Sequence, residues 1–118
     1  MKTELILKEV VAGLNGKNGL IRQHFHQAKQ TRERFRLMFM SQTKNRHPGS
    51  VSVDYIGFKC RFMDWDNFSA SFKHIGDALV KAKIITDDNP KIIQQFNVQQ
   101  IKVSKLSEQK TVIIIQDL

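Results

Sequence analysis

The feature that most constrains the fold is an apolar stripe of helical period in the second half of the chain. Its members recur every three or four residues and are Phe68, Phe72, Ile75, Leu79 and Ala82. This spacing predicts a helix over about residues 67–83 that buries one face. A helix with one apolar face must pack against another element, so the stripe requires a layered fold.

Four other segments show the pattern of strands, and they cover about residues 3–11, 51–63, 95–106 and 111–115. In the second of these segments the even positions from Ile56 to Phe62 are apolar. Lys59 and Arg61 are therefore expected to point to the opposite face. A further helical pattern runs over about residues 20–42. We predict an α+β fold in which a small mixed β-sheet is packed with two main helices.

The chain has 118 residues, which fits a single domain over residues 1–118. Apolar residues make up 41% and charged residues 25%, the balance of a soluble globular protein. The single cysteine, Cys60, cannot form an internal disulfide, and it is expected to be a buried small apolar residue. No segment has the length and apolarity of a membrane span, and no signal-peptide pattern is seen, so we expect a cytoplasmic protein.

The net charge of +8 is concentrated in one half of the chain. Residues 1–50 contain ten Lys or Arg against three Glu, a net +7, and residues 51–118 contain nine against eight acids, a net +1. A basic half joined to a nearly neutral half indicates one part that attracts a polyanion. A generally basic, well-solvated surface is the alternative.

The predicted helix over residues 20–42 carries Arg22, Lys29 and Arg36 one heptad apart. Residues at this repeat form a row along a helix, and each cation of the row could neutralise one backbone phosphate. A solvated helix face explains the same pattern. Leu37 and the nearby methionines widen the apolar surface of this helix, which suggests that a second copy covers it in a homodimer.

Acidic residues gather in two short segments, Asp64-Trp65-Asp66-Asn67 and Asp87-Asp88-Asn89-Pro90. Carboxylate oxygens are the ligands that Mg²⁺ prefers, and Mg²⁺ supports hydrolysis of phosphodiesters. Asp64 and Asp66 are two residues apart at the predicted end of a strand, a spacing that lets both side chains face the same way. Asp88 can join them only if the chain after the helix returns beside the preceding strand.

Each of these residues also has a purely structural interpretation. Asp66 could be the N-cap of the following helix, and residues 87–90 could form an ordinary turn. Lys73 follows Asp66 by seven residues, so a regular helix would place both on nearly the same face, where the ammonium could stabilise transition-state charge. An ion pair between Lys73 and Asp77, four residues on, is the alternative that the spacing favours.

The ordered motifs from about Phe62 to Pro90 resemble the RusA family of bacterial and phage Holliday junction resolvases. The resemblance rests on Asp64-Trp65-Asp66-Asn67, then Lys73, then the segment from Asp77 to Ala82, and then Asp87-Asp88-Asn89. Aligning Lys73 with the family's lysine requires a gap after Asn67. The glycine-rich segment over residues 13–19 replaces the family's Pro-rich turn.

The resemblance implies a homodimer that binds Mg²⁺, which Mn²⁺ can replace, and makes paired nicks in a four-way DNA junction. It assigns metal binding to Asp64, Asp66 and Asp88 and catalysis to these residues together with Lys73. It implies no membrane partner and no small-molecule cofactor. The phosphate contacts would then come from four basic residues of the first helix: Arg22, Lys29, Arg32 and Arg36.

Two other functions fit the same residues. One is a non-catalytic, basic DNA-binding dimer whose aspartates serve only as caps and turns. The other is a Mg²⁺-dependent nuclease that acts on flaps or replication forks.

Overall fold

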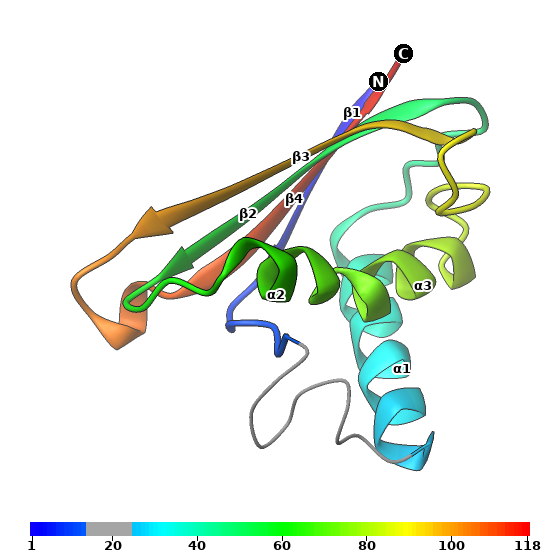
Figure 1. Cartoon of the computed structure of the whole chain (residues 1–118). Helices are drawn as coiled ribbons and strands as arrows, with labels where there is room; N and C mark the ends of the chain where they lie inside the picture. The colour runs from blue at the N-terminus through cyan, green and yellow to red at the C-terminus, as the bar shows by residue number, and fades with distance from the viewer. Residues whose placement is uncertain (14–24) are drawn as a thin grey trace.

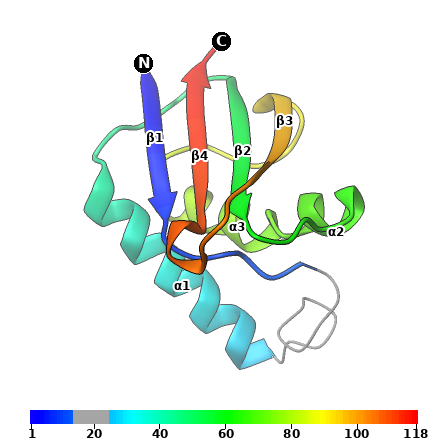
Figure 2. The same ribbon diagram turned by 90° about the vertical axis from the view of Figure 1, so that its left-hand side faces the viewer.

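Four strands form one mixed sheet in the computed structural model of the chain, which describes residues 1–13 and 25–118. The strands are β1 (Lys2–Leu7), β2 (Val51–Lys59), β3 (Ile93–Lys102) and β4 (Lys110–Asp117). They lie side by side in the order β1-β4-β2-β3 (Figure 2). Strands β2 and β3 are parallel, whereas β4 is antiparallel to both β1 and β2. The prediction of an α+β fold with a small mixed sheet is confirmed.

The helices all lie on one face of this sheet and leave the other face open (Figure 1). They are α1 (Phe25–Gln42), α2 (Trp65–Ala70) and α3 (Lys73–Lys81), and a 3₁₀ turn, η2 (Leu106–Glu108), precedes β4. The chain from β2 through α2 and α3 to β3 is a crossover between parallel neighbours, which antiparallel pairs do not need. Among the described residues, no helix combines the length and the apolarity needed to cross a bilayer.

The core fills the space between the sheet and the helices. Helix α1 contributes Phe35 and Phe39, whose rings are 6.3 Å apart between centroids, and α3 contributes Ile75 and Leu79. The sheet contributes buried residues from all four strands: Leu5, Leu7, Val51, Val53, Tyr55, Ile93, Ile113 and Ile115. The apolar stripes predicted for the two helical segments therefore face the sheet wherever the structure describes their side chains.

The faces of β2 are the reverse of the prediction. Residues at odd positions lie under the helices and are buried, and they include Lys59, whose side chain is only 2% exposed. Ile56 and Phe58 are half-buried on the open face. Apolar residues occupy both phases of this strand, so alternation alone does not decide which phase the helices cover. The strand ends at Lys59, so the segment up to Met63 is not part of it, and Cys60 is only half-buried.

The predicted helix over residues 67–83 is two helices, α2 and α3, separated at Ser71 and Phe72. The Ser71 hydroxyl donates a hydrogen bond to the Phe68 carbonyl 2.5 Å away and lies 2.6 Å from the Tyr55 hydroxyl. A serine side chain that bonds to the backbone of its own helix competes with helical hydrogen bonds. The interruption changes the relation between Asp66, in α2, and Lys73, which begins α3.

The ends of the described chain meet at one end of the sheet, where Lys2 pairs with Gln116 across β1 and β4. Buried His47 lies beside them, with its Nε2 2.7 Å from the Thr3 hydroxyl and its Nδ1 2.7 Å from Asp117 Oδ1. Asp117 also pairs with the N-terminal ammonium, at 3.1 Å. The lower end of β2, from which the candidate site continues, lies at the opposite end of the sheet (Figure 1).

Candidate functional site

The first acidic segment lies where β2 passes into α2. Asp64 is the N-cap of α2, with extended backbone angles, and its backbone carbonyl accepts the Phe68 N–H at 2.9 Å. Its side chain makes no capping hydrogen bond. Asp66 lies in the first turn of the helix, and its Oδ1 accepts the N–H of Asn67. The interpretation of Asp66 as the N-cap is therefore wrong, because the helix begins earlier than predicted.

Both carboxylates are exposed, as expected for a site that meets a ligand. The expectation that strand geometry points them the same way does not apply, because β2 ends at Lys59 and Asp66 is already helical. Consecutive residues of a helix are rotated by about 100° from one another, whereas residues two apart in a strand share a face. Asp64 and Asp66 are therefore neighbours in sequence without a strand-imposed common direction.

The second acidic segment forms a turn after α3. Asp87 Oδ1 accepts the backbone N–H of Asp88, and Asp87 Oδ2 accepts a hydrogen bond from the Asn89 amide. Asn89 Oδ1 in turn accepts the N–H of Lys91 at 2.9 Å. The turn interpretation of residues 87–90 is confirmed, and it assigns Asp87 and Asn89 a structural role.

Asp88 points from this turn toward the start of α3. A side-chain carbon added at Gly76 would lie 3.2 Å from Asp88 Oδ2, so the glycine leaves room for the carboxylate. Partial burial raises the pKa of the Asp88 carboxyl, and the hydrogen bond and negative charge of Asp87, with the charge of Asp77, raise it further. A pKa moved in this direction means that the ionised carboxylate lacks sufficient compensating positive charge.

Lys73 makes the ion pair that its spacing predicts. Its Nζ lies 3.7 Å from Asp77 Oδ1, and its side chain is 64% exposed. The structural alternative for Lys73 is thus confirmed as a contact, at a separation where exposed pairs contribute a few tenths of a kcal/mol. Its predicted catalytic role stays a prediction.

The parallel pairing of β2 and β3 decides how the two acidic segments are related. Strand β3 lies beside β2, which is the condition under which Asp88 could return toward Asp64 and Asp66. However, Asp64 follows the end of β2 and Asp88 precedes the start of β3, so the two segments continue from opposite ends of the parallel pair. The Asp88 side chain lies beside Phe72 and Gly76, which follow Asp66 by six and ten residues, a rise of about 10–15 Å along a helix. Helices α2 and α3 run between the two ends (Figure 1).

Within residues 1–13 and 25–118, no three His, Cys, Asp or Glu side chains are placed so that they could hold one metal ion. Asp64, Asp66 and Asp88 therefore do not form a common three-residue ligand set in this conformation.

The predicted basic row of α1 is only partly available to a ligand. Lys29 is exposed, but Arg36 pairs with Glu33 one turn before it. Arg32 is half-buried and lies close enough to His74 to affect its pKa. Arg22 lies outside the described residues. The described part of the row thus contains one exposed cation, Lys29, and one paired cation, Arg36, and its predicted contacts with phosphates stay a prediction.

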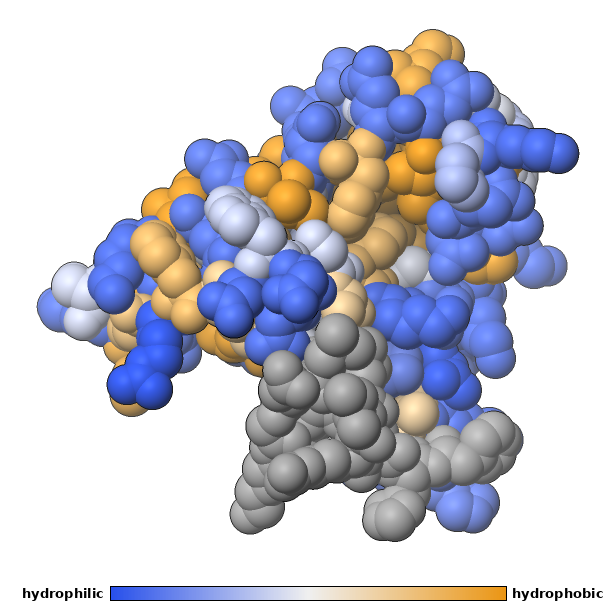
Figure 3. Space-filling view, in the orientation of Figure 1, coloured by the Kyte–Doolittle hydropathy of each residue, from blue (hydrophilic) through white to orange (hydrophobic). Residues whose placement is uncertain are grey.

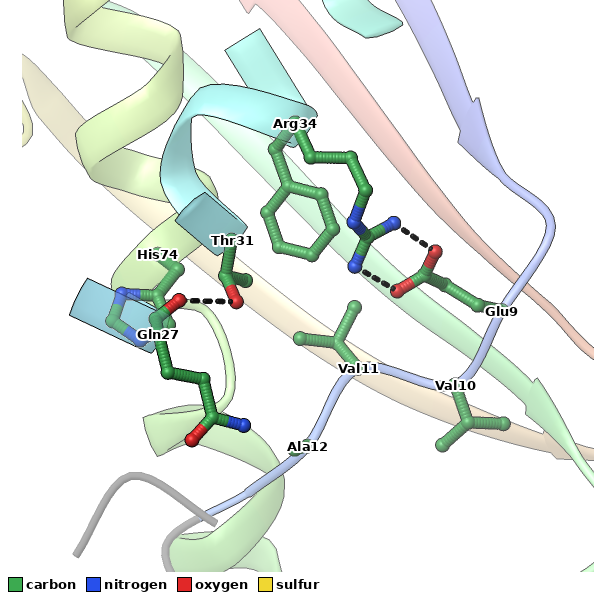
Figure 4. Close-up of a pocket in the computed structure, with 9 residues that line it drawn as sticks. Glu9, Val10, Val11, Ala12, Gln27, Thr31, Arg34 and His74 are labelled. Carbon is green, nitrogen blue, oxygen red and sulfur yellow. Dashed lines mark hydrogen bonds and ion pairs between the residues drawn. The ribbon is translucent and has the colours of Figure 1, made fainter. Parts of the chain in front are cut away.

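A hollow of about 260 Å³ lies between α1, α3 and the segment that follows β1. Arg34 and Glu9 form a two-bonded ion pair on one side of it, while His74 and Gln27 lie on the other (Figure 4). Burial lowers the pKa of His74, and the positive charge of Arg32 lowers it further. Sequence reasoning missed this hollow, because its residues come from three distant segments that share no motif.

Lys59 is the second feature that the sequence did not indicate. Its ammonium lies 4.2 Å from the ring centroid of Phe68, and no described acidic residue pairs with it. Gly57 makes this arrangement possible, since an added Cβ there would lie 2.9 Å from Lys59 Cε and 2.8 Å from the Phe68 ring. Burial lowers the pKa of Lys59 to about 8. An alternation that begins from Ile56 gives no signal of a buried lysine.

The chain matches no protein-family model, and a search of curated proteins finds no significant relative.

Proposed function

We propose that the protein is a Mg²⁺-dependent, structure-selective endodeoxyribonuclease that resolves four-way DNA junctions as a homodimer. The proposal rests on the resemblance of residues 62–90 to the RusA family. The geometry adds one supporting observation, which concerns the ion pairing of the three aspartates that the resemblance assigns to metal binding.

These three aspartates are without cationic partners in a strongly basic chain. Among the described residues, the ion pairs of acidic side chains involve Glu9, Glu33, Asp77 and Asp117, and none involves Asp64, Asp66 or Asp88. The raised pKa of Asp88 agrees with an uncompensated negative charge at one end of the α2–α3 unit. Carboxylates left unpaired in this way are available to a divalent cation.

The function requires these carboxylates to come closer together than they are here. The Asp88 turn and the start of α2 are both surface segments, and binding of a metal cation between them would offset the mutual repulsion of their carboxylates. The expected sign is therefore that Mg²⁺ stabilises the folded chain. Its affinity sets the size of the effect through the ratio of free Mg²⁺ to the dissociation constant.

Cleavage of a synthetic four-way junction tests the proposal. Wild-type protein is expected to cut the junction in Mg²⁺ or Mn²⁺ and to cut duplex DNA much more slowly at the same salt concentration, which must be fixed because affinity depends strongly on it. Asp66→Asn should lose cleavage by at least about 100-fold while keeping junction binding. Asp54→Asn is the matched control, since Asp54 lies on the open face and bonds Asn97.

A second candidate is a non-catalytic, basic DNA-binding dimer. The observation that favours it is the lack of a three-residue metal ligand set in the described chain. Wild-type protein that binds the junction in both metals and leaves it intact would establish this alternative. Cleavage of a flap or fork in preference to the junction would instead assign the nuclease to those substrates.

A further inference from the structure

Two large aromatic side chains are exposed beside the first acidic segment. Phe62 is 52% exposed and Trp65 is 57% exposed, and they lie on either side of Asp64 in the chain. Single exposed apolar residues are common on protein surfaces, but two exposed aromatic side chains within four residues of one segment indicate a contact surface.

The backbone that carries these rings is held in place. The Gln100 side chain bonds both sides of Met63, accepting its N–H at 2.9 Å and donating to its carbonyl at 2.9 Å. The side-chain oxygen Oε1 of Gln109 accepts the backbone N–H of Cys60 at 2.9 Å. Two glutamines from β3 and from the turn before β4 thus fix the segment at two points. The exposed rings are therefore carried by a backbone that is already held in place. Such a segment loses less conformational freedom on ligand binding than an unrestrained loop would.

The indole of Trp65 is supported from below. Its ring meets Phe68 edge-to-face, with centroids 6.4 Å apart and planes at 68°. Phe68 is itself buried, stacked on Tyr55 at 4.6 Å and covered by the Lys59 ammonium. Such a stack holds the indole in one orientation while leaving more than half of Trp65 in contact with solvent.

Positive charge lies next to one of the two rings, that of Phe62. The Lys102 ammonium is 5.4 Å from the ring centroid of Phe62, and Arg61 precedes that residue and is exposed. Apolar and hydrophilic surfaces alternate over this end of the molecule, around the end of β2 and the start of α2 (Figure 3). Aromatic faces beside cations match a nucleotide, which offers a flat base to the ring and a phosphate to the cation.

We propose that Phe62 and Trp65 form a base-stacking site for an unpaired nucleotide of the nucleic-acid substrate, with Lys102 and Arg61 binding the adjacent phosphate. The inference rests on the proposed function and narrows its substrate class to DNA with bases unstacked at a branch point. Stacking here would place the neighbouring phosphodiester beside Asp64 and Asp66. A protein partner with an acidic, apolar surface is the competing occupant, and the experiment separates the two.

Trp65 is the single tryptophan of the chain, so its fluorescence reports on this site alone. We would titrate the protein, in EDTA, with a short single-stranded oligodeoxynucleotide and with an abasic oligonucleotide of equal length and charge. The base-bearing strand should quench Trp65 emission and bind more tightly, whereas the abasic strand should not quench it. Phe62→Ala should weaken binding of the base-bearing strand about 5- to 100-fold and leave the abasic strand unaffected.

Leu118→Ala is the matched control, because Leu118 is 60% exposed and lies at the opposite end of the sheet (Figure 1). Its affinity for both strands should equal that of wild type. Trp65→Phe should keep the preference for the base-bearing strand and Trp65→Ala should lose it, as measured by anisotropy of a labelled strand. Circular dichroism of each variant separates a lost contact from a lost fold.

The outcomes distinguish this inference from the proposed nuclease activity. Equal affinity for both strands, or binding without quenching, overturns the stacking site even if the wild type cuts junctions. Quenching by the base-bearing strand supports the site even if no metal supports cleavage, in which case the nuclease proposal fails. Quenching by an acidic peptide but by neither oligonucleotide assigns the surface to a protein partner and overturns the inference.

Discussion

The two ends of the sheet bury polar groups in opposite ways. At the end where β1 begins, His47 is buried between Thr3 and Asp117, and both of its ring nitrogens have partners at 2.7 Å. At the end where β2 finishes, Lys59 is equally buried. Its ammonium contacts the face of the Phe68 ring and has no acidic partner among the described residues. The hydrogen bonds of His47 compensate for the free-energy cost of removing its ring nitrogens from water. The cation–π contact of Lys59 compensates for the desolvation of its ammonium only in part.

This difference separates a region built for stability from one that tolerates instability. The end around His47 connects β1, β4 and the loop before β2 through hydrogen bonds, so it stabilises the pairing of β1 with β4. The under-compensated end carries Asp64, Asp66 and the exposed rings of the proposed stacking site. Strain and unsatisfied charge concentrate at functional sites, where they serve binding rather than folding. Four substitutions test the contrast, from the largest expected effect to the smallest.

His47→Ala should destabilise the protein by about 3 kcal/mol, because it removes two buried hydrogen bonds and leaves a cavity. Denaturant unfolding monitored by circular dichroism measures the change. Arg46→Ala, an exposed neighbour, should change the free energy of unfolding by less than about 0.5 kcal/mol. A His47 variant as stable as the Arg46 variant would show that the end around His47 does not stabilise the pairing of β1 with β4.

Gly57→Ala should cost about 2 kcal/mol, since the added methyl would meet the Phe68 ring at 2.8 Å and Lys59 Cε at 2.9 Å. Gly49→Ala is the matched substitution, because an added Cβ there meets nothing within 4 Å. The Gly49 variant should unfold at the same denaturant concentration as wild type. Equal stability of both variants would mean that the space between Gly57, Lys59 and the Phe68 ring is loosely packed.

Lys59→Met should stabilise the protein at neutral pH. Methionine keeps the apolar stem and removes a charge that burial disfavours. The fall in the Lys59 pKa from 10.5 to about 8 corresponds to about 3 kcal/mol, and loss of the cation–π contact with Phe68 reduces the expected gain to about 1–2 kcal/mol. Loss of stability in this variant would show that the ammonium has a compensating partner after all.

The pH dependence of the same pair gives an independent test. Between pH 8 and 10.5 the unfolded chain binds a proton at Lys59 that the folded chain has released. The stability of the wild type relative to Lys59→Met should therefore rise with pH across this window, and the advantage of the methionine variant should disappear above it. A difference that does not vary with pH would assign the effect to packing instead.

Asp88→Asn should have the smallest effect, a gain of about 0.3 kcal/mol at neutral pH, because the carboxylate is largely solvated. The folded state raises the Asp88 pKa above its ordinary value of 3.8, so the folded chain takes up the proton first as the solution is acidified. The gain should therefore shrink as pH falls through the raised pKa. Added Mg²⁺ should reverse the order of the two stabilities if the proposed function is correct, and thermal unfolding with and without the ion measures this.

The sequence predicted the elements of the fold better than their orientation. The spacing of Phe68, Ile75 and Leu79 correctly identified the face that meets the sheet. It did not predict the break at Ser71. A serine in the sequence does not show whether its hydroxyl will bond a backbone carbonyl of its own helix, as Ser71 does with Phe68. The faces of β2 could not be assigned either, since both phases of that strand contain apolar residues.

For the candidate site, the sequence predicted local contacts and not long-range ones. The pair between Lys73 and Asp77 and the turn over residues 87–90 depend on a few neighbouring residues, and both are present. Whether Asp88 meets Asp66 depends on how β3 aligns with β2, which no local pattern encodes. The aromatic surface at Phe62 and Trp65 was missed because Phe62 was assigned to a strand that in fact ends at Lys59.

The position of β4 has a consequence for how the protein comes into being. This strand lies in the interior of the sheet between β1 and β2, yet it is the last of the described strands in sequence order. A nascent chain leaving the ribosome must keep β1 unpaired until residues 110–117 emerge, because among the described strands β1 pairs with β4 alone. Pairing of β1 with β4 is thus a late, long-range event in folding. Until it occurs, β1 and β2 have exposed edges, and we expect chaperones to be needed at this stage.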